Sequence, residues 1–177
     1  GFQVVFIGVH LPAYLADQGL PADVGVTCLA LIGLFNIFGT FGAGWLGQHF
    51  SKKHLLAAIY IVRSVIIVAF LAAPLTPWSA YLFAMAIGLL WLATVPLTNG
   101  IVAQVFGVAY LSMLGGFVFL SHQLGSFLGA WLGGVLFDRT GSYDVVWWIS
   151  IALGIAAGLL NLPIDEREIR RPAAARA

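Results

Sequence analysis

The sequence predicts an all-α membrane protein with six transmembrane helices, and two observations lead to this expectation. The 177 residues are 61% hydrophobic and only 8% charged, whereas a soluble globular domain is about 25% charged. The apolar residues also gather in stretches close to the roughly 20 residues that a helix needs to cross a bilayer. These stretches are apolar throughout and do not alternate with polar residues, which favours helices over the strands of a membrane β-barrel.

Three helices are expected in the first half of the chain. They cover about 1–16, 24–47 and 54–73. The breaks after them hold turn-forming residues at 17–21, the lysine pair Lys52 and Lys53, and two prolines within 74–77. The first helix is short, and neither a methionine nor a basic segment precedes it, so we expect a chain that starts inside a helix of something longer.

Three further helices are expected in the second half. They cover about 78–98, 109–137 and 143–163. The segment between 98 and 109 has no charge, whereas 138–142 combines two charges with small residues. We therefore expect a six-helix transmembrane bundle over 1–164, followed by a basic tail over 165–177.

The distribution of positive charge predicts the orientation. Six of the eight lysines and arginines follow the second or the sixth helix, on one side of a six-helix chain, and Arg139 is the basic residue of the other side. Cytoplasmic loops carry the excess of such residues, so we expect the Lys52-Lys53 loop and the tail in the cytoplasm of a multi-pass inner-membrane protein. The net charge of +1, without a basic stripe, argues against nucleic acid as a partner.

The second and fifth helices repeat each other at an offset of 86 residues. FGTFGAGWLG at 38–47 aligns with LGSFLGAWLG at 124–133, and Asn36 and Thr40 align with His122 and Ser126. An offset of three helices is an odd number, so the copies must cross the membrane in opposite directions. The sequence therefore predicts a 3+3 inverted repeat, the pattern of secondary transporters.

Each copy is followed by a similar loop, GWLGQHFSKK and GVLFDRTG. With six helices and the repeat, these loops resemble the G-x-L-x-D-R-x-G motif of the major facilitator superfamily, in the C-terminal six-helix half of its twelve-helix fold. The resemblance implies a gate built from the loops, with Gln48 where the family usually has aspartate. The loops align at 90 residues and the helices at 86, so we expect the fifth helix to run about one turn longer. The candidate gate residues are Gly44, Gln48, Lys52, Lys53, Gly134, Asp138, Arg139 and Gly141.

Two tracts, GVHLPAYLADQG at 8–19 and SHQLGSFLGAWLGG at 121–134, are similar to bacterial members of the monocarboxylate-transporter type. This likeness implies secondary active transport of a small organic solute, such as an organic anion, by alternating access and without a cofactor. A missing N-terminal six-helix half would complete the pathway. Many such carriers place an arginine on the second of these helices to hold a carboxylate; Thr40 stands there instead.

Polar residues inside the helices are the candidates for the substrate pathway, because burying an unpaired polar group costs several kcal/mol. On the first helix three of them share a face, which predicts a cavity wall or, alternatively, hydrogen bonding between helices. Pro12 on that helix is expected to open the backbone locally. The candidates are Gln3, His10, Tyr14, Asn36, Thr40, Arg63, Thr94, Thr98, Asn99, His122, Gln123 and Ser126.

Two of these candidates have more than one interpretation. Pro96 lies between Thr94 and Thr98 and predicts a break, whose freed carbonyls either bind substrate or are satisfied by the threonines. Arg63 lies near the middle of the third helix, where an arginine costs about 2.5–3.5 kcal/mol to insert. It either binds an anionic substrate or bonds carbonyls or an asparagine of a neighbouring helix. The small-residue stripes of the second and fifth helices predict close packing.

The seven acidic residues lie outside the helices, apart from Asp144 at the very start of the last one, so His10 or His122 would have to titrate if this half takes part in proton coupling. Two other functions compete with transport. A structural or assembly subunit fits the half-size of the chain. An intramembrane serine protease needs a serine and a histidine on different helices, and Gly125-Ser126 lacks the expected flanking pattern. No metal site is expected.

Overall fold

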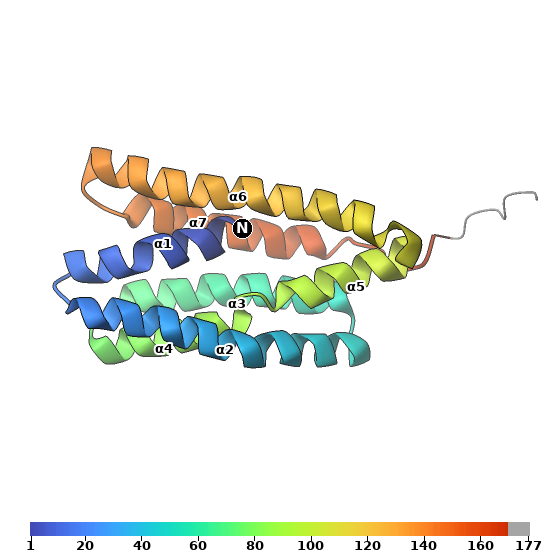
Figure 1. The fold of residues 1–177 in the computed structure, drawn as a ribbon, viewed down its shortest axis with the longest axis horizontal. Helices are drawn as coiled ribbons and strands as arrows, with labels where there is room; N and C mark the ends of the chain where they lie inside the picture. Colours follow the sequence, from blue (N-terminus) through green and yellow to red (C-terminus); the bar gives the residue numbers. More distant parts are fainter. Residues whose placement is uncertain (170–177) are drawn as a thin grey trace, which may run out of the picture.

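The computed structural model describes residues 1–169, and within them it contains helices and no strand (Figure 1). The helices are α1 (Phe2–Asp17), α2 (Ala22–His49), α3 (Lys52–Ala72), α4 (Pro77–Leu90), α5 (Thr94–Phe106), the short 3-10 helix η1 (Val108–Tyr110), α6 (Leu111–Thr140) and α7 (Asp144–Asn161). Five segments are long and apolar enough to cross a membrane, with α4 and α5 counted together, and α1 is a shorter apolar helix. The chain is an all-α membrane protein, as the composition predicts.

The fourth span differs most from its expected bounds. It does not end at 98 but continues to Phe106, and it is interrupted at 91–93. The interruption follows from Pro96, since a proline lacks the amide hydrogen and its ring clashes with the carbonyl four residues earlier, here that of Leu92. The span ends at Gly107, whose φ of 86° favours glycine.

Two other helix-level predictions have opposite outcomes. The offset of 86 places His49, the last residue of α2, over Val135, and α6 continues five residues further to Thr140. The extra turn of the fifth span is confirmed. Pro12, by contrast, lies inside a continuous α1, so the expected local opening is absent. Pro12 packs against Gly25 of α2, where an added Cβ would lie 2.9 Å from it, and this close packing holds the helix in place.

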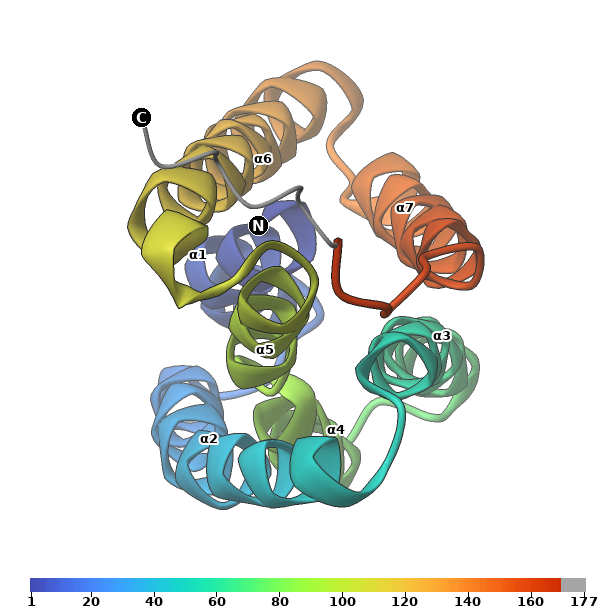
Figure 2. The same ribbon diagram turned by 90° about the vertical axis from the view of Figure 1, so that its right-hand side faces the viewer.

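The six spans, with α4 and α5 as one, run alternately in opposite directions, and their packing follows the repeat (Figures 1 and 2). Helix α2 packs mainly against α4, α6 mainly against α1, and α3 against α7. The glycines at these crossings leave no room for a side chain: a Cβ on Gly39 would overlap the backbone of Leu89, and one on Gly129 would overlap that of Phe2. The predicted close packing of the small-residue stripes is confirmed at these two crossings.

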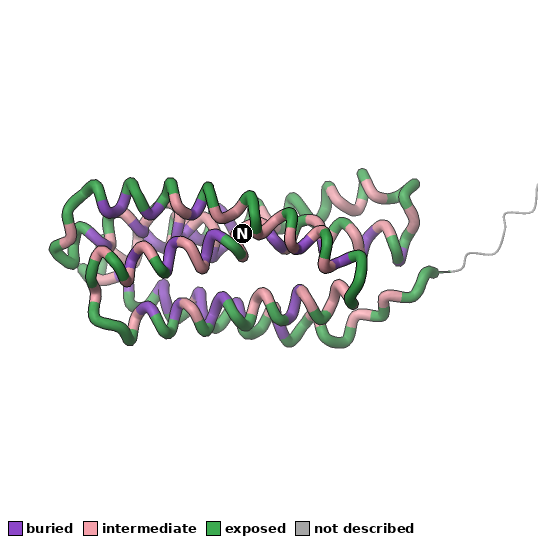
Figure 3. Tube along the Cα trace, turned by 90° about the horizontal axis from the view of Figure 1, so that it is seen from below, coloured by how far each residue is buried: buried purple, intermediate pink, exposed green. Residues whose placement is uncertain are grey.

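The buried residues form two clusters of unequal size (Figure 3). The larger one surrounds the fully buried Trp147, whose ring meets that of Phe6 edge-on at 4.8 Å between centroids. It lies at the end of the bundle with loops 17–22, 72–77 and 140–144. The smaller cluster lies toward the other end. Most of α6 is exposed, with large apolar residues such as Phe119 and Trp131 on its surface, which suits contact with lipid or another bundle.

Candidate functional site

A cavity of about 720 Å³ lies between α5 and the first half of α6. It is large enough for a small organic molecule. Four of the predicted pathway residues line it, namely Thr94, Thr98, Asn99 and His122. Tyr60 of α3, and Ser112 and Ser121 of α6, add hydroxyl groups that the sequence analysis did not single out.

Arg63 is directed at the break in the fourth span and does not line this cavity. Its side chain is 5% exposed. Nε donates to the Leu90 carbonyl at 3.1 Å, and Nη2 donates to the carbonyls of Leu90 and Trp91, the latter at 2.6 Å. The guanidinium also lies 5.6 Å from the centre of the Tyr60 ring. These contacts favour the alternative in which Arg63 bonds carbonyls of a neighbouring helix and does not bind an anionic substrate.

Asn36 bonds the other side of the same break. Its Oδ1 accepts a hydrogen bond from the backbone N–H of Leu92 at 3.0 Å and another from the Thr40 hydroxyl at 3.1 Å. Both residues are half-buried on α2. The freed carbonyls are therefore satisfied by Arg63, and neither threonine of α5 bonds them in the described part of the chain.

The polar residues of α1 join helices and do not line the cavity. The Gln3 amide donates to the Ser150 carbonyl of α7 at 2.7 Å, and His10 Nε2 lies 2.9 Å from the Ala130 carbonyl of α6. The Tyr14 ring packs on Trp147 with centroids 5.5 Å apart. These contacts favour the alternative of hydrogen bonding and packing between helices for this face.

On α6, His122 is at the centre of a small polar group. Its Nδ1 lies 3.3 Å from both Gln123 Oε1 and Ser126 Oγ. Ser126 is buried, and its hydroxyl donates to the carbonyl of His122 at 2.9 Å. Only His122 of these three reaches the cavity wall, which leaves one titratable imidazole facing the space where a solute would lie.

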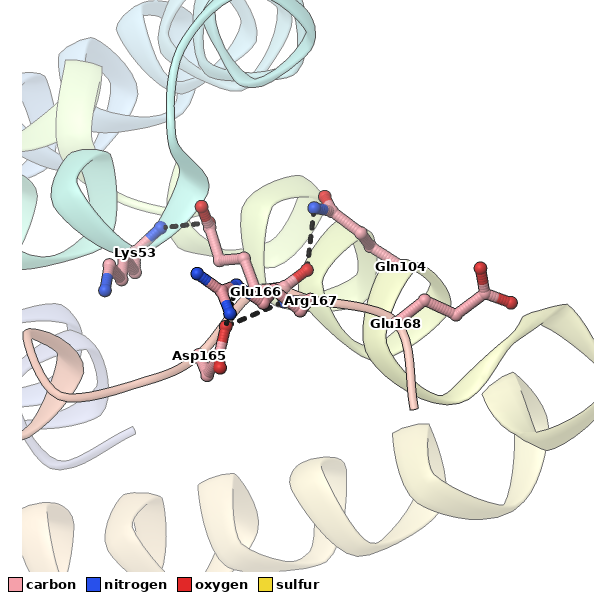
Figure 4. A pocket seen from close by; sticks show the side chains of 6 residues that line it. All are labelled: Lys53, Gln104, Asp165, Glu166, Arg167 and Glu168. Atoms are coloured by element: carbon pink, nitrogen blue, oxygen red, sulfur yellow. Dashed lines mark hydrogen bonds and ion pairs between the residues drawn. The ribbon is translucent and has the colours of Figure 1, made fainter. Parts of the chain in front are cut away.

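Lys53 of the first loop motif holds the segment that follows α7 (Figure 4). Lys53 donates twice, from its backbone N–H to Glu166 Oε1 at 2.8 Å and from Nζ to the Ile164 carbonyl at 2.7 Å. Lys52 Nζ donates to Gln104 Oε1 of α5 at 2.8 Å. Ser51, the residue before α3, makes no capping bond with its side chain, so Glu166 supplies the acceptor at the start of that helix.

Residues 164–169, here called the C-terminal strap, thus cross the ends of α3 and α5. The Gln104 amide donates to the Glu166 carbonyl at 2.9 Å, and the Ile169 N–H donates to the Val105 carbonyl at 3.0 Å. A hollow of about 930 Å³ lies here, lined by Lys53, Gln104, Asp165, Glu166, Arg167 and Glu168. Residues 165–169 were expected in a basic tail, but the residues at 165, 166 and 168 are acidic, and these are the signal in the sequence for the strap. The rest of that tail, 170–177, lies outside the described residues.

Several forces act on the Glu166 carboxyl. Burial raises its pKa, but several hydrogen bonds, first of all that from the Lys53 backbone, together with the charge of Lys52 lower it by more, so the pKa lies below its usual value. The carboxylate is therefore ionised near neutral pH and faces the N-terminal end of α3, where the helix dipole favours negative charge.

The remaining gate residues make local contacts. Among the described residues, Gln48 Nε2 reaches only the Gly44 carbonyl of its own helix, at 3.5 Å. In the second loop Gly141 is left-handed, with φ 69°, and its N–H bonds the Phe137 carbonyl at 2.7 Å to end α6. Asp138 and Arg139 are exposed. Gly134 has open space beside it.

A family model described as the Major Facilitator Superfamily matches residues 1–177. The chain belongs to the major facilitator superfamily. The resemblance seen in the loop motifs and the repeat is confirmed, and the broken fourth span and the cavity beside it are features of a chain from this family.

Three relatives within the superfamily carry transporter names. The MFS-type transporter YcxA of Bacillus subtilis is 26% identical over 174 residues, which are 95% of this chain and 42% of that protein. Monocarboxylate transporter 13 of Bos taurus is 26% identical over 158 residues, 88% of this chain and 37% of that protein. The MFS transporter asaE of Aspergillus flavus is 22% identical over 146 residues, which are 80% of this chain and 33% of that protein. The chain spans less than half the length of each of these relatives.

Proposed function

We propose that the chain forms one six-helix half of a secondary transporter, which carries a small organic solute across the membrane by alternating access. The cavity between α5 and α6 carries this proposal. Its wall combines the hydroxyls of Thr94 and Thr98, the amide of Asn99 and the imidazole of His122 with apolar surface. Polar groups inside a membrane span are rare and often face a substrate pathway. A second six-helix half would close the cavity.

An organic anion is the substrate class that we propose for the complete carrier. Three of the relatives, from cattle, rat and zebrafish, are named monocarboxylate transporters. In this half the Arg63 guanidinium is bound to carbonyls of α4, and no lysine, arginine or carboxylate side chain lines the cavity in the described part of the chain. The cation that an anion needs is then expected from the second half, while this half binds the uncharged part of the solute.

We further propose that the end with the C-terminal strap faces the cytoplasm of a cell whose inner membrane holds the protein. The lysines of the first loop and the arginines after α7 support this orientation. The proposal is transport and not catalysis: Ser126 lies within reach of His122, but its hydroxyl is buried and donates to a backbone carbonyl of its own helix. A nucleophile needs a hydroxyl that faces its substrate.

Uptake by the full-length carrier tests the proposal. The protein is reconstituted in lipid vesicles, and uptake of radiolabelled short monocarboxylates and of neutral solutes of similar size is measured with and without a proton gradient. Thr98→Val removes a cavity hydroxyl at nearly constant volume, and we expect it to lower uptake several-fold. Thr27→Val, at an exposed position of α2 away from the cavity, is the matched control. Folded protein that moves no solute would contradict the proposal and favour a structural subunit.

A further inference from the structure

We propose that Arg63 and Asn36 are positioning residues, which fix the backbone break between α4 and α5 and thereby hold Thr94 and Thr98 on the cavity wall. The inference begins with the break itself. Ending one helix and starting another leaves carbonyl and N–H groups without helical partners. Within a bilayer no water is present to satisfy them. A break at this depth therefore needs partners from neighbouring helices.

Arg63 supplies the donors. A guanidinium is planar and presents several N–H groups in a fixed fork, and here two of its nitrogens point to the carbonyls of Leu90 and Trp91. Leu90 is the last residue of α4 and Trp91 is its C-cap, so the guanidinium lies at the end of the helix where the dipole is negative and favours a cation. The charge of Arg63 and its hydrogen bonds thus stabilise the same end of the same helix.

Asn36 supplies the acceptor from the opposite side. Its Oδ1 bonds the N–H of Leu92, one residue beyond the carbonyls that Arg63 holds, and the Thr40 hydroxyl keeps that oxygen in place. Three residues further along α2, Gly39 lies directly against the backbone of Leu89. Because α2 is packed this closely on α4, the position of Asn36 relative to the break is fixed.

The consequence for the cavity follows from the chain after the break. Leu92, Thr94 and Thr98 all line it, and the first two flank Ala93, which is 2% exposed. Helix α5 starts where Arg63 and Asn36 hold the chain, so its orientation depends on them. The two residues, although polar and inside the membrane, act through the backbone and not on the solute.

Cysteine labelling tests this without any transport measurement. In the full-length carrier, Thr98→Cys is labelled with a maleimide, and Ser121→Cys on the α6 side of the cavity is the control position. Native Cys28 is fully buried and gives a low background. We expect Arg63→Met or Asn36→Leu to change the labelling rate at Thr98→Cys at least five-fold, and at Ser121→Cys less than two-fold. Asn36→Asp keeps the oxygen acceptor and should stay within two-fold of the parent.

The double variant sharpens the test. Because both residues act on one break, Arg63→Met with Asn36→Leu should change the rate no more than the larger single effect. The inference would be overturned if Asn36→Leu leaves the labelling rate at Thr98→Cys unchanged, or if the rates at both cysteines change equally. The comparison of Asn36→Leu with Asn36→Asp decides the question even if Arg63→Met does not fold. The inference rests on the proposed function only in taking the cavity as a solute site. If the labelling rates change as expected but the carrier takes up no solute, the transport proposal fails and the positioning role of Arg63 and Asn36 stands.

Discussion

Replacing Glu166 should release the C-terminal strap from the start of α3, and the structure sets the size of the effect. Glu166 Oε1 accepts the Lys53 N–H at 2.8 Å, in the place of the cap that Ser51 does not provide. Loss of a helix-capping acceptor costs about 1 kcal/mol. Glu166 is only half-buried, so solvent screens its charge, and we expect the loss of this hydrogen bond to cost no more than that. About 1 kcal/mol corresponds to a roughly five-fold change in the local opening equilibrium.

Hydrogen–deuterium exchange of the full-length carrier in lipid nanodiscs measures that equilibrium directly. In Glu166→Ala the Lys53 amide should exchange about five-fold faster, and the Ile169 amide, which bonds Val105, should follow because both belong to the strap contact. Glu166→Gln keeps an oxygen acceptor and should lose less protection. Amides in the middle of α7 serve as the internal control. Unchanged exchange of the Lys53 amide in Glu166→Ala would refute the capping role.

The pH dependence of the same exchange has a definite sign. The pKa of Glu166 is lower in the folded protein than its usual value, since several hydrogen bonds, first of all that from Lys53, and the Lys52 charge together outweigh the effect of burial. The ionised carboxylate therefore stabilises the strap at pH values above the ordinary glutamate pKa, and this contribution is lost as pH falls through the folded-state pKa. After correction for intrinsic exchange, protection of the Lys53 amide should fall on acidification in the parent and not in Glu166→Gln.

Three further predictions concern other parts of the bundle. Gly129→Ala should destabilise the protein by about 1–3 kcal/mol, because the added Cβ meets the backbone of Phe2; thermal unfolding checks this, with Gly116→Ala, which has open space, as the neutral control. His122→Gln should retain most uptake but change its pH profile, since that imidazole lines the cavity; the same profile in parent and variant would place any proton coupling elsewhere. Cys28 should resist maleimide until the protein unfolds, because it is fully buried; labelling of the folded parent would contradict the packing of α2.

The arrangement of the helices could be predicted from sequence because it depends on run length and repetition. The offset of 86 pairs Gly39 with Gly125, and these glycines lie on the two helix crossings, α2 on α4 and α6 on α1, that the repeat makes equivalent. The four residues by which the loop motifs are displaced from that offset also predicted the longer α6. Such signals can be recognised in an apolar sequence because glycines are needed where helices cross and turn residues where helices end.

The partners of polar side chains could not be predicted in the same way. Arg63 and His10 both bond backbone carbonyls, which every residue has, so no letter of the sequence marks the partner. The sequence did show Pro96 and the freed carbonyls, but not which neighbouring helix would reach them. The strap was missed for a different reason: the net charge of 165–177 is positive, and that sum concealed the acidic residues that contact α3.

The two prolines inside the spans, Pro12 and Pro96, affect their helices differently. The repeat relates α1 to the α4–α5 span, yet α1 is one rigid rod through Pro12, whereas its counterpart has a joint before Pro96. At the jointed end α5 starts from a break that Arg63 and Asn36 hold by hydrogen bonds, and the strap bonds its last turn. At the other end the rings around Trp147 must separate together or not at all. The two ends of this half are therefore held by different forces, directional hydrogen bonds to the backbone at one and aromatic packing at the other.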